Sequence, residues 1–232
     1  MIRRLGQWMM LTGILPAITA LAVAPVVLGQ ETHIARETIE WCNIWIPEAN
    51  GTTLPRALLI GDSITQGYSP KVAEKLTEKV SVARLTTSKS IGDPVLLAEV
   101  ALVLDQCRFD VVHFNNGLHG WDYSEEEYQR HFPELLATIR KHAPKAKLIW
   151  ATITPIRQSG KLDVIAENTK RVQARNKIAE GIVTKEGIVV DDLYDLVKGH
   201  PEYWSKDGVH FNGSGIAAQA EQVSKRILQS LK

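Results

Sequence analysis

A serine, an aspartate and a histidine have the types and spacing that nucleophilic catalysis requires. Ser63 lies in "GDSIT", directly after an apolar run, and Asp207 and His210 stand three residues apart in "SKDGVHF". A serine hydroxyl needs a base to take its proton, and an imidazole needs a carboxylate on its other nitrogen to fix the tautomer. These residue types predict acyl transfer with Ser63 as nucleophile, His210 as base and Asp207 as the group that orients the base.

Each of the three residues also has an ordinary structural interpretation. A serine in a Gly-Asp-Ser turn often caps a helix, and an aspartate before Gly208 often forms a turn. His210 could be a core or capping histidine. The combination favours catalysis, because Asp207 and His210 stand close enough to pair in a loop after a predicted strand, on the same edge as Ser63.

A tetrahedral intermediate would need hydrogen-bond donors for its negatively charged oxygen. We expect an oxyanion hole made of the Ser63 N–H, the N–H of Gly92 in "SKSIGDP", and a side chain from "FNNGLHG". In that last segment His119 is the first candidate and Asn116 the alternative. Asn115 and its polar neighbours either contact the substrate or satisfy one another in a loop network.

Aromatic residues flank two of these segments. Trp121 and Tyr123 follow "FNNGLHG", and Tyr203 and Trp204 precede "SKDGVHF". Aromatic rings beside a shallow site can stack on sugar rings, although partial burial under loops is common for such residues. The residues expected to contact the substrate are Asp62, Asn115, Trp121 and Trp204.

The elements that must position these residues alternate between strand length and helix length. Apolar runs rich in Val, Ile and Leu predict five strands buried on both faces, at 56–62, 80–86, 110–116, 146–154 and 187–193. Helix starts are expected at Ser69-Pro70, Asp93-Pro94 and Ser124, and amphipathic segments cover about 164–183 and 214–231. This alternation predicts βαβ units and a parallel sheet, with the site at the carboxyl ends of the strands.

The quoted segments resemble the sequence blocks of the SGNH hydrolases, also called GDSL esterases and lipases. Gly61–Thr65 is similar to the first block, Gly92 to the glycine of the second, Gly117–Gly120 to the third and Asp207–His210 to the last. The resemblance spans about residues 56–231. It implies a flavodoxin-like, three-layer α/β/α sandwich with a doubly wound, five-stranded parallel sheet. It also implies a Ser-Asp-His mechanism without metal or organic cofactor, and hydrolysis of esters or thioesters.

The third block departs from the family pattern Gly-x-Asn-Asp. His119 stands where the oxyanion asparagine is expected, and Gly120 replaces the aspartate. A histidine N–H can donate to an oxyanion, but this capacity depends on the tautomer and the protonation of the ring. The second block also lacks the usual asparagine beside Gly92.

The N-terminus has the pattern of an export signal. Two arginines precede a charge-free run from Leu5 to Gly29, and a cut after Gly29 would place small residues at the positions that a signal peptidase reads. An uncleaved membrane anchor is the alternative, since the run is long enough to span a bilayer. We therefore expect a signal peptide at 1–29, an extension at 30–55 and a hydrolase-like domain at 56–232, in a secreted or periplasmic protein.

The composition narrows the function classes. A chain of 232 residues with 44% hydrophobic content can bury one sizeable core, and a formal net charge of +1 gives no electrostatic reason to expect nucleic acid. Cysteine and histidine show no metal-ligand spacing, and no phosphate-binding GxxxxGK[ST] or GxGxxG motif is present. The spacing of Cys42 and Cys107 leaves open whether they pair.

The leading hypothesis is an exported serine esterase that removes O-acetyl or other short acyl groups from a carbohydrate. The alternatives are a catalytically silent glycan-binding module on the same fold, a lipase or thioesterase, and an acyltransferase in which a sugar hydroxyl replaces water. The expected partner is a small-molecule or glycan ester. We expect contact with a membrane only if the N-terminal segment is not cleaved.

Overall fold

Five parallel strands form the centre of the fold, and each corresponds to one of the apolar runs. They are β2 (Arg56–Gly61), β3 (Ser81–Thr87), β4 (Val111–Phe114), β5 (Lys147–Ala151) and β8 (Val189–Asp191). Their order across the sheet is β3-β2-β4-β5-β8. The chain therefore winds outward first on one side of β2 and then on the other, which is the doubly wound, flavodoxin-like order. The predicted parallel sheet is confirmed.

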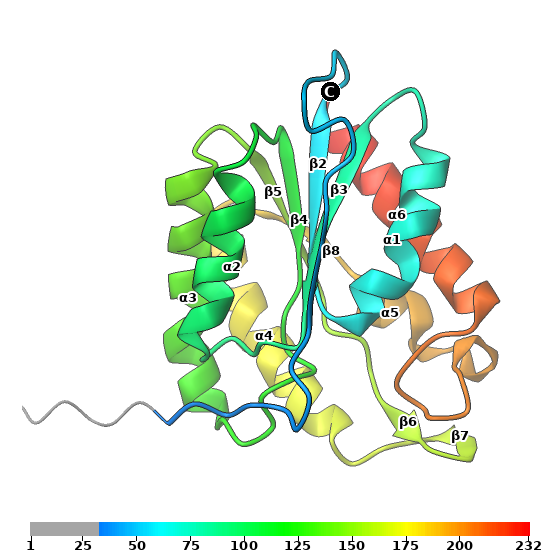
Figure 1. Ribbon diagram of the computed structural model, residues 1–232. Helices are drawn as coiled ribbons and strands as arrows, with labels where there is room; N and C mark the ends of the chain where they lie inside the picture. Colours follow the sequence, from blue (N-terminus) through cyan, green and yellow to red (C-terminus); the bar gives the residue numbers. More distant parts are fainter. Residues whose placement is uncertain (1–32) are drawn as a thin grey trace, which may run out of the picture. The chain divides into compact units, whose positions relative to one another are not determined.

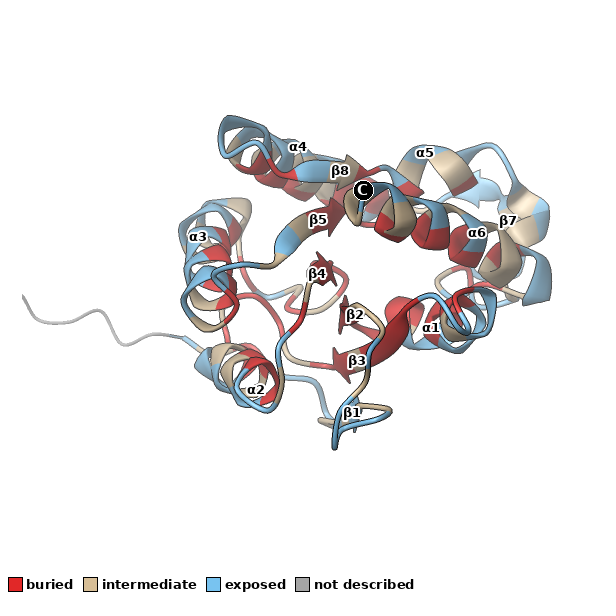
Figure 2. Ribbon diagram, turned by 90° about the horizontal axis from the view of Figure 1, so that it is seen from above, coloured by how far each residue is buried: buried red, intermediate tan, exposed pale blue. Residues whose placement is uncertain are grey.

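Helices cover both faces of the sheet (Figures 1 and 2). One face carries α2 (Pro94–Leu104), α3 (Glu125–His142) and α4 (Thr169–Lys185), and the other carries α1 (Ser63–Lys75), α5 (Leu193–Lys198) and α6 (Gly213–Ser230). All six residues of β2 are buried, as expected for a strand packed on both sides. The three-layer α/β/α sandwich is confirmed.

The computed structural model describes residues 33–232. The predicted signal peptide, residues 1–29, lies outside the described residues. None of the helices in residues 33–232 combines the length and the apolar character that a membrane crossing needs. Cys42 and Cys107 are both free, so they form no disulfide with each other in this structure.

A sixth strand, β1 (Cys42–Trp45), joins the sheet antiparallel to β3 and was not predicted. It lies in the extension 30–55, and three of its four residues are exposed, although Cys42, Ile44 and Trp45 are apolar. Hydrogen bonding between the two segments continues beyond it. The Trp41 N–H donates to Ser88 Oγ at 2.9 Å, and the Ser88 N–H donates to the Trp41 carbonyl oxygen at 3.0 Å.

The first helix begins earlier than predicted. Asp62 caps it by accepting the Ile64 N–H at 2.9 Å, so α1 starts at Ser63. Pro70, which suggested a start at Ser69-Pro70, lies inside the helix instead. The other two predicted starts are confirmed, because Asp93 caps α2 and Ser124 forms a capping box with Glu127 on α3.

A small hairpin interrupts the segment that was predicted as helix from residue 164. It consists of β6 (Arg157–Gln158) and β7 (Lys161–Ile165), and α4 starts only at Thr169. A short 3₁₀ helix, η1 (Pro201–Tyr203), follows α5. The hairpin lies at the lower edge of the sheet in Figure 1, where the parallel strands end.

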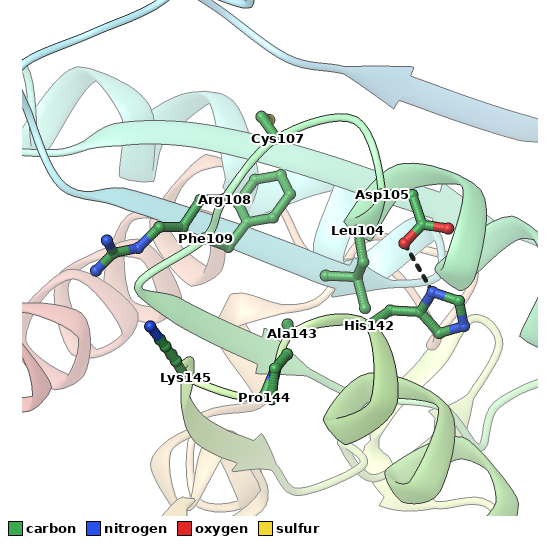
Figure 3. A pocket seen from close by; sticks show the side chains of 9 residues that line it. All are labelled: Leu104, Asp105, Cys107, Arg108, Phe109, His142, Ala143, Pro144 and Lys145. Carbon is green, nitrogen blue, oxygen red and sulfur yellow. Dashed lines mark hydrogen bonds and ion pairs between the residues drawn. The ribbon is translucent and has the colours of Figure 1, made fainter.

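A surface pocket lies at the opposite edge, between the ends of α2 and α3 (Figure 3). His142 Nδ1 lies 2.7 Å from Asp105 Oδ1 across its mouth. The lining residues come directly before β4 and β5, so the pocket lies at the amino ends of the strands. This position separates it from the residues predicted to carry the chemistry.

The buried carboxylate of Asp93 ties the extension to the start of α2. It accepts the Val95 N–H at 2.9 Å and lies 3.0 Å from Arg36 Nε and 3.9 Å from Lys89 Nζ. We expect Asp93→Ala to lower the free energy of unfolding by about 2 kcal/mol, because a helix cap and a buried charge partner are both lost. Arg36→Ala should lower the free energy of unfolding by much less, because the Arg36 side chain is half exposed and Lys89 remains as a positive partner for Asp93. Urea denaturation of both variants checks this, and equal losses would contradict it.

Candidate active site

The structure brings Ser63, His210 and Asp207 together in one hydrogen-bonded chain. Ser63 is the first residue of α1, directly after β2, and its Oγ lies 2.9 Å from His210 Nε2. His210 Nδ1 lies 2.8 Å from Asp207 Oδ2. The two segments meet because β2 ends at the carboxyl edge of the sheet, and the loop before α6 returns to the same edge.

A tight turn fixes the Asp207 carboxylate. Its Oδ1 accepts the N–H groups of Val209 at 2.8 Å and His210 at 2.9 Å, and Gly208 supplies a positive φ of 76° between them. Oδ2 is left to accept from His210 Nδ1–H. With the proton on Nδ1, the neutral imidazole presents Nε2 as an acceptor toward the Ser63 hydroxyl.

The same contacts determine the charge of Asp207. Burial by itself raises the pKa of this carboxyl, but the Val209 N–H and the ring and N–H of His210 lower it by more, so the net pKa lies below the ordinary value. The group is therefore ionised at neutral pH. An ionised carboxylate can stabilise the imidazolium that forms when His210 takes a proton.

The β6–β7 hairpin supports this turn from the side. The Arg157 N–H donates to the Gly208 carbonyl oxygen at 2.8 Å, and the Gly160 N–H donates to the Lys206 carbonyl oxygen at 3.1 Å. A Cβ on residue 208 would lie 2.2 Å from the Arg157 carbonyl oxygen, so glycine is needed for this approach as well as for the turn. The hairpin and the turn therefore pack as one unit.

The site is open to solvent. The side chains of Asp207 and His210 are 49% and 48% exposed. Ser63 is partly exposed at the start of its helix. A shallow site of this kind can admit an ester group that is attached to a large molecule.

The loop after β4 lies beside the start of α1. Leu118 and Asn115 line the same small cavity as Ile64, Thr65 and Tyr68. This contact brings the loop that carries His119 next to the helix turn that carries Ser63. The predicted third segment of the site therefore reaches the same edge as the first.

Within this loop the asparagines and the histidine have different partners. Asn115 is buried and its Nδ2 donates to the Ala151 carbonyl oxygen at 2.7 Å. Asn116 is also buried and donates to the Lys89 carbonyl oxygen at 2.8 Å. His119 is more accessible, and its Nδ1 lies 2.9 Å from Glu37 Oε1. The asparagine contacts are those of a loop network, which leaves His119 as the remaining oxyanion candidate in this loop.

Gly92 has a packing reason to be glycine. A Cβ on residue 92 would lie 2.6 Å from the nearest ring atom of Tyr123, whose side chain is buried. The hydroxyl oxygen of Tyr123 accepts the Ala35 N–H at 2.9 Å, which fixes the ring. The sequence analysis assigned the Gly92 N–H to the oxyanion hole, and the structure explains the missing side chain by the packing of Tyr123.

The remaining predicted substrate contacts occupy different environments. Asp62 is buried and caps α1. Trp204 is 3% exposed, with the Arg157 guanidinium 4.4 Å from its ring centroid, so the structure leaves it no open face for a sugar. Trp121 is partly exposed and lies beside Arg171 and Arg175. Of the two tryptophans, Trp121 is the one that a ligand can reach.

A buried arginine that the sequence analysis missed holds the loop after β4. The Arg175 side chain is 1% exposed and donates to four carbonyl oxygens. Its Nη1 lies 2.8 Å from the oxygen of Gly117 and 3.1 Å from that of His119, and its Nη2 lies 2.9 Å from the oxygen of Gly120 and 3.2 Å from that of Tyr123. Burial lowers the pKa of this guanidinium, and neighbouring Arg171 adds to the effect. An arginine within an amphipathic helix gives no sequence signal of such a role.

Within residues 33–232, no three His, Cys, Asp or Glu side chains are grouped so that they could hold a metal ion. The groups at the carboxyl edge are the Ser63 hydroxyl, the imidazoles of His119 and His210, and the hydrogen-bond donors around them. This set of groups can carry out nucleophilic acyl transfer.

The profile of the GDSL-like lipase/acylhydrolase family matches residues 59–218 of this chain. The match covers more than half of the sequence. It includes Ser63, the loop after β4 and the turn from Asp207 to His210. No curated protein matches the sequence as a relative.

Several solved structures share the fold. A GDSL-like lipase from Bacteroides thetaiotaomicron superposes with a TM-score of 0.60 at 17% identity, covering 79% of this chain and 95% of that protein. A carbohydrate esterase family 3 protein from Talaromyces cellulolyticus gives 0.60 at 18% identity, covering 76% and 97%. An acetyl xylan esterase gives 0.60 at 18% identity, covering 74% and 99%. At these identities the likeness establishes the fold.

The two arginines of α4 allow a matched stability test. We expect Arg175→Met to lower the free energy of unfolding by about 2–4 kcal/mol, because four carbonyl oxygens in a buried place each lose a donor. Arg171→Met should cost about 1 kcal/mol, because the Arg171 side chain is one-third exposed and water can replace its hydrogen bonds. Urea denaturation measures both, and a larger loss for Arg171→Met would refute the role assigned to Arg175.

Proposed function

Because this chain belongs to the GDSL-like lipase/acylhydrolase family, we propose that it is an exported serine ester hydrolase that removes O-acetyl or other short acyl groups from a carbohydrate. The observation that carries the proposal is the chain of hydrogen bonds from Ser63 through His210 to Asp207. It joins a nucleophile, a base and an orienting carboxylate in the order that acyl transfer requires.

The first half of the reaction acylates Ser63. His210 Nε2 takes the hydroxyl proton while Ser63 Oγ attacks the acyl carbonyl carbon, and Asp207 stabilises the imidazolium that results. The tetrahedral intermediate then collapses. The bond from the carbonyl carbon to the alkoxy oxygen breaks, His210 returns the proton to that oxygen, and the alcohol leaves.

The second half releases the acid. A water molecule takes the place of the alcohol, gives its proton to His210 and attacks the acyl-enzyme. Collapse of this second intermediate breaks the bond to Ser63 Oγ, which recovers its proton from His210. The products are a free carboxylic acid and a sugar hydroxyl.

The donors proposed for the oxyanion are the N–H groups of Ser63 and Gly92 and the side chain of His119. Ser63 is the first residue of α1, and the N–H groups at a helix start favour negative charge. His119 lies in a loop that shares a cavity with the same helix turn. The proposal has both groups donate to the same oxygen atom.

The substrate class rests on two observations. The open site suits an ester on the surface of a large molecule. Similar structures include an acetyl xylan esterase and a carbohydrate esterase. Trp121 is the aromatic residue proposed to contact the sugar.

Export is part of the proposal and rests on the sequence. The N-terminal arginines and the charge-free run to Gly29 have the pattern of a cleaved signal. A glycan substrate outside the cytoplasm is consistent with that route.

Replacing the nucleophile tests the proposal directly. We expect the native protein to hydrolyse a short-chain chromogenic ester and to release acetate from acetylated xylan, whereas Ser63→Ala should do neither. A fluorophosphonate should form an adduct on Ser63 that mass spectrometry can locate. An unlabelled Ser63 with turnover no higher than that of the variant would overturn the esterase proposal and leave a silent binding module.

Changing the orienting carboxylate tests the assignment of His210 as the base. Asp207→Asn keeps an oxygen for the Val209 and His210 N–H groups, but its amide can donate to His210 Nδ1 and so favour the wrong tautomer. We expect kcat to fall by about 10³- to 10⁴-fold, as expected when the base of such a triad is held in the wrong tautomer. Steady-state kinetics with a chromogenic ester measures this, and circular dichroism controls for folding. A loss below about tenfold would show that Asp207 does not orient the base.

A further inference from the structure

A small polar cavity lies beside the helix turn that carries Ser63. Its volume is about 10 Å³, and its walls come from the start of α1, the loops after β4 and β5, and the start of α5. The polar residues that line it are Thr65, Tyr68, Asn115, Thr152 and Thr154. Asn115 donates to a backbone carbonyl oxygen, and the Thr152 hydroxyl both donates and accepts outside the cavity. Three hydroxyl groups are left to be accounted for.

Two of these three hydroxyl groups share a single hydrogen bond. Thr65 Oγ1 lies 3.0 Å from Tyr68 Oη, and either atom can be the donor. Burial raises the pKa of Tyr68, so its hydroxyl keeps its proton. Each hydroxyl then carries one proton, and only one of the two protons is used in their shared bond. Among the hydrogen bonds of residues 33–232, the other proton has no acceptor.

The third hydroxyl, that of Thr154, makes no hydrogen bond to any described residue, although Thr154 is only 3% exposed. The backbone on both sides of it is fixed. Asn176 accepts the Ile153 N–H and donates to the Ile153 carbonyl oxygen, both at 2.8 Å. Thr169 Oγ1 accepts the Ile156 N–H at 2.9 Å and donates to the Ile156 carbonyl oxygen at 2.7 Å. The loop after β5 therefore holds Thr154 at the cavity wall.

One water molecule can satisfy all three hydroxyl groups. The pair of Thr65 and Tyr68 has a proton to donate, and Thr154 can either donate or accept. A water molecule does both, and a polar cavity of about this volume has room for one. Leaving a buried hydroxyl without a partner costs free energy, whereas a buried water recovers the missing hydrogen bonds.

We propose that the cavity binds one ordered water molecule, which bridges Thr154 to the pair of Thr65 and Tyr68 and makes Thr154 a positioning residue for Ser63. Thr65 lies two residues after Ser63, in the same turn of α1. The bridge ties this turn to the anchored loop after β5. It thereby restrains the backbone from which Ser63 Oγ contacts His210 Nε2 at 2.9 Å. The effect on catalysis rests on the proposed esterase function, whereas the water site does not.

A high-resolution crystal structure of the native protein tests the water site directly. We expect electron density for one water molecule within hydrogen-bond distance of Thr154 Oγ1 and of Thr65 Oγ1 or Tyr68 Oη. Thr154→Val removes one end of the bridge without changing the size of the side chain, so this density should disappear or weaken in the variant. A native cavity without density would overturn the proposal.

Thr86 provides a matched control for stability. It is fully buried on β3, its Oγ1 also lacks a hydrogen bond within the described residues, and it does not line the cavity. Replacing a buried hydroxyl that has no partner by a methyl group is neutral or stabilising, whereas removing one end of a bridge leaves the other end unsatisfied. We therefore expect Thr154→Val to lower Tm by about 2–5 °C. Thr86→Val should leave Tm unchanged or raise it, and an equal loss in both variants would overturn the proposal.

Kinetics with the chromogenic ester tests the positioning of Ser63. We expect kcat of Thr154→Val to fall about 3- to 30-fold with little change in KM, because the nucleophile is held less firmly. Thr154→Ser keeps the hydroxyl, so its kcat should stay within about twofold of the native value. Equal losses in the two variants, or no loss in Thr154→Val, would overturn the positioning role.

The fluorophosphonate adduct separates this inference from the proposed function. If Ser63 reacts and esters turn over, an unchanged kcat in Thr154→Val removes the positioning role alone. If Ser63 is unreactive, the esterase function fails, while the crystallographic density and the difference in Tm between Thr154→Val and Thr86→Val still decide whether the water site exists.

Discussion

The arrangement of the site depends on one hydrogen bond, between Ser63 Oγ and His210 Nε2, which joins residues 147 positions apart. Such a contact is possible because parallel strands deliver their carboxyl ends to one edge of the sheet, so that loops distant in sequence meet there. β2 places Ser63 at the start of α1, and the turn before α6 places His210 opposite it. The hairpin β6–β7 then holds that turn through backbone hydrogen bonds to Lys206 and Gly208.

The loops at the carboxyl edge of the sheet are held by two different kinds of hydrogen bonding. The turn at Asp207 is satisfied locally, because one carboxylate oxygen accepts two nearby backbone N–H groups. The loop after β4 turns several carbonyl oxygens inward instead, and a single buried guanidinium, that of Arg175, donates to four of them. The hydrogen bonds of Asp207 can be recognised from a short sequence motif. The hydrogen bonds to the loop after β4 require an arginine that lies more than fifty residues away along the chain.

This difference explains what could be predicted from the sequence. Continuous apolar runs mark strands that are buried on both faces, so the five parallel strands were predictable, and the family resemblance implied their flavodoxin-like arrangement. Short motifs placed Ser63, Asp207 and His210 at one edge. β1 was missed because residues 30–55 were interpreted as a poorly patterned extension, although its exposed residues Cys42, Ile44 and Trp45 are apolar. The start of α1 was predicted too late because Pro70 was taken as a helix start instead of Asp62 as a cap. The contacts of Glu37 and Arg175 are purely tertiary, and no local pattern encodes them.

The pairing of Glu37 with His119 also has a consequence for the order of folding. Their positions differ by 82 residues, and the partner loop is complete only after β4 has been added to the sheet. The contact between Ser63 and His210 forms only when the turn before α6, the last helix, is in place. Contacts of such long range form late, because the chain entropy of closing long loops must be overcome first. Residues near both ends of the described chain therefore complete the site. A partly folded molecule with only its central strands in place would lack both His210 and the extension.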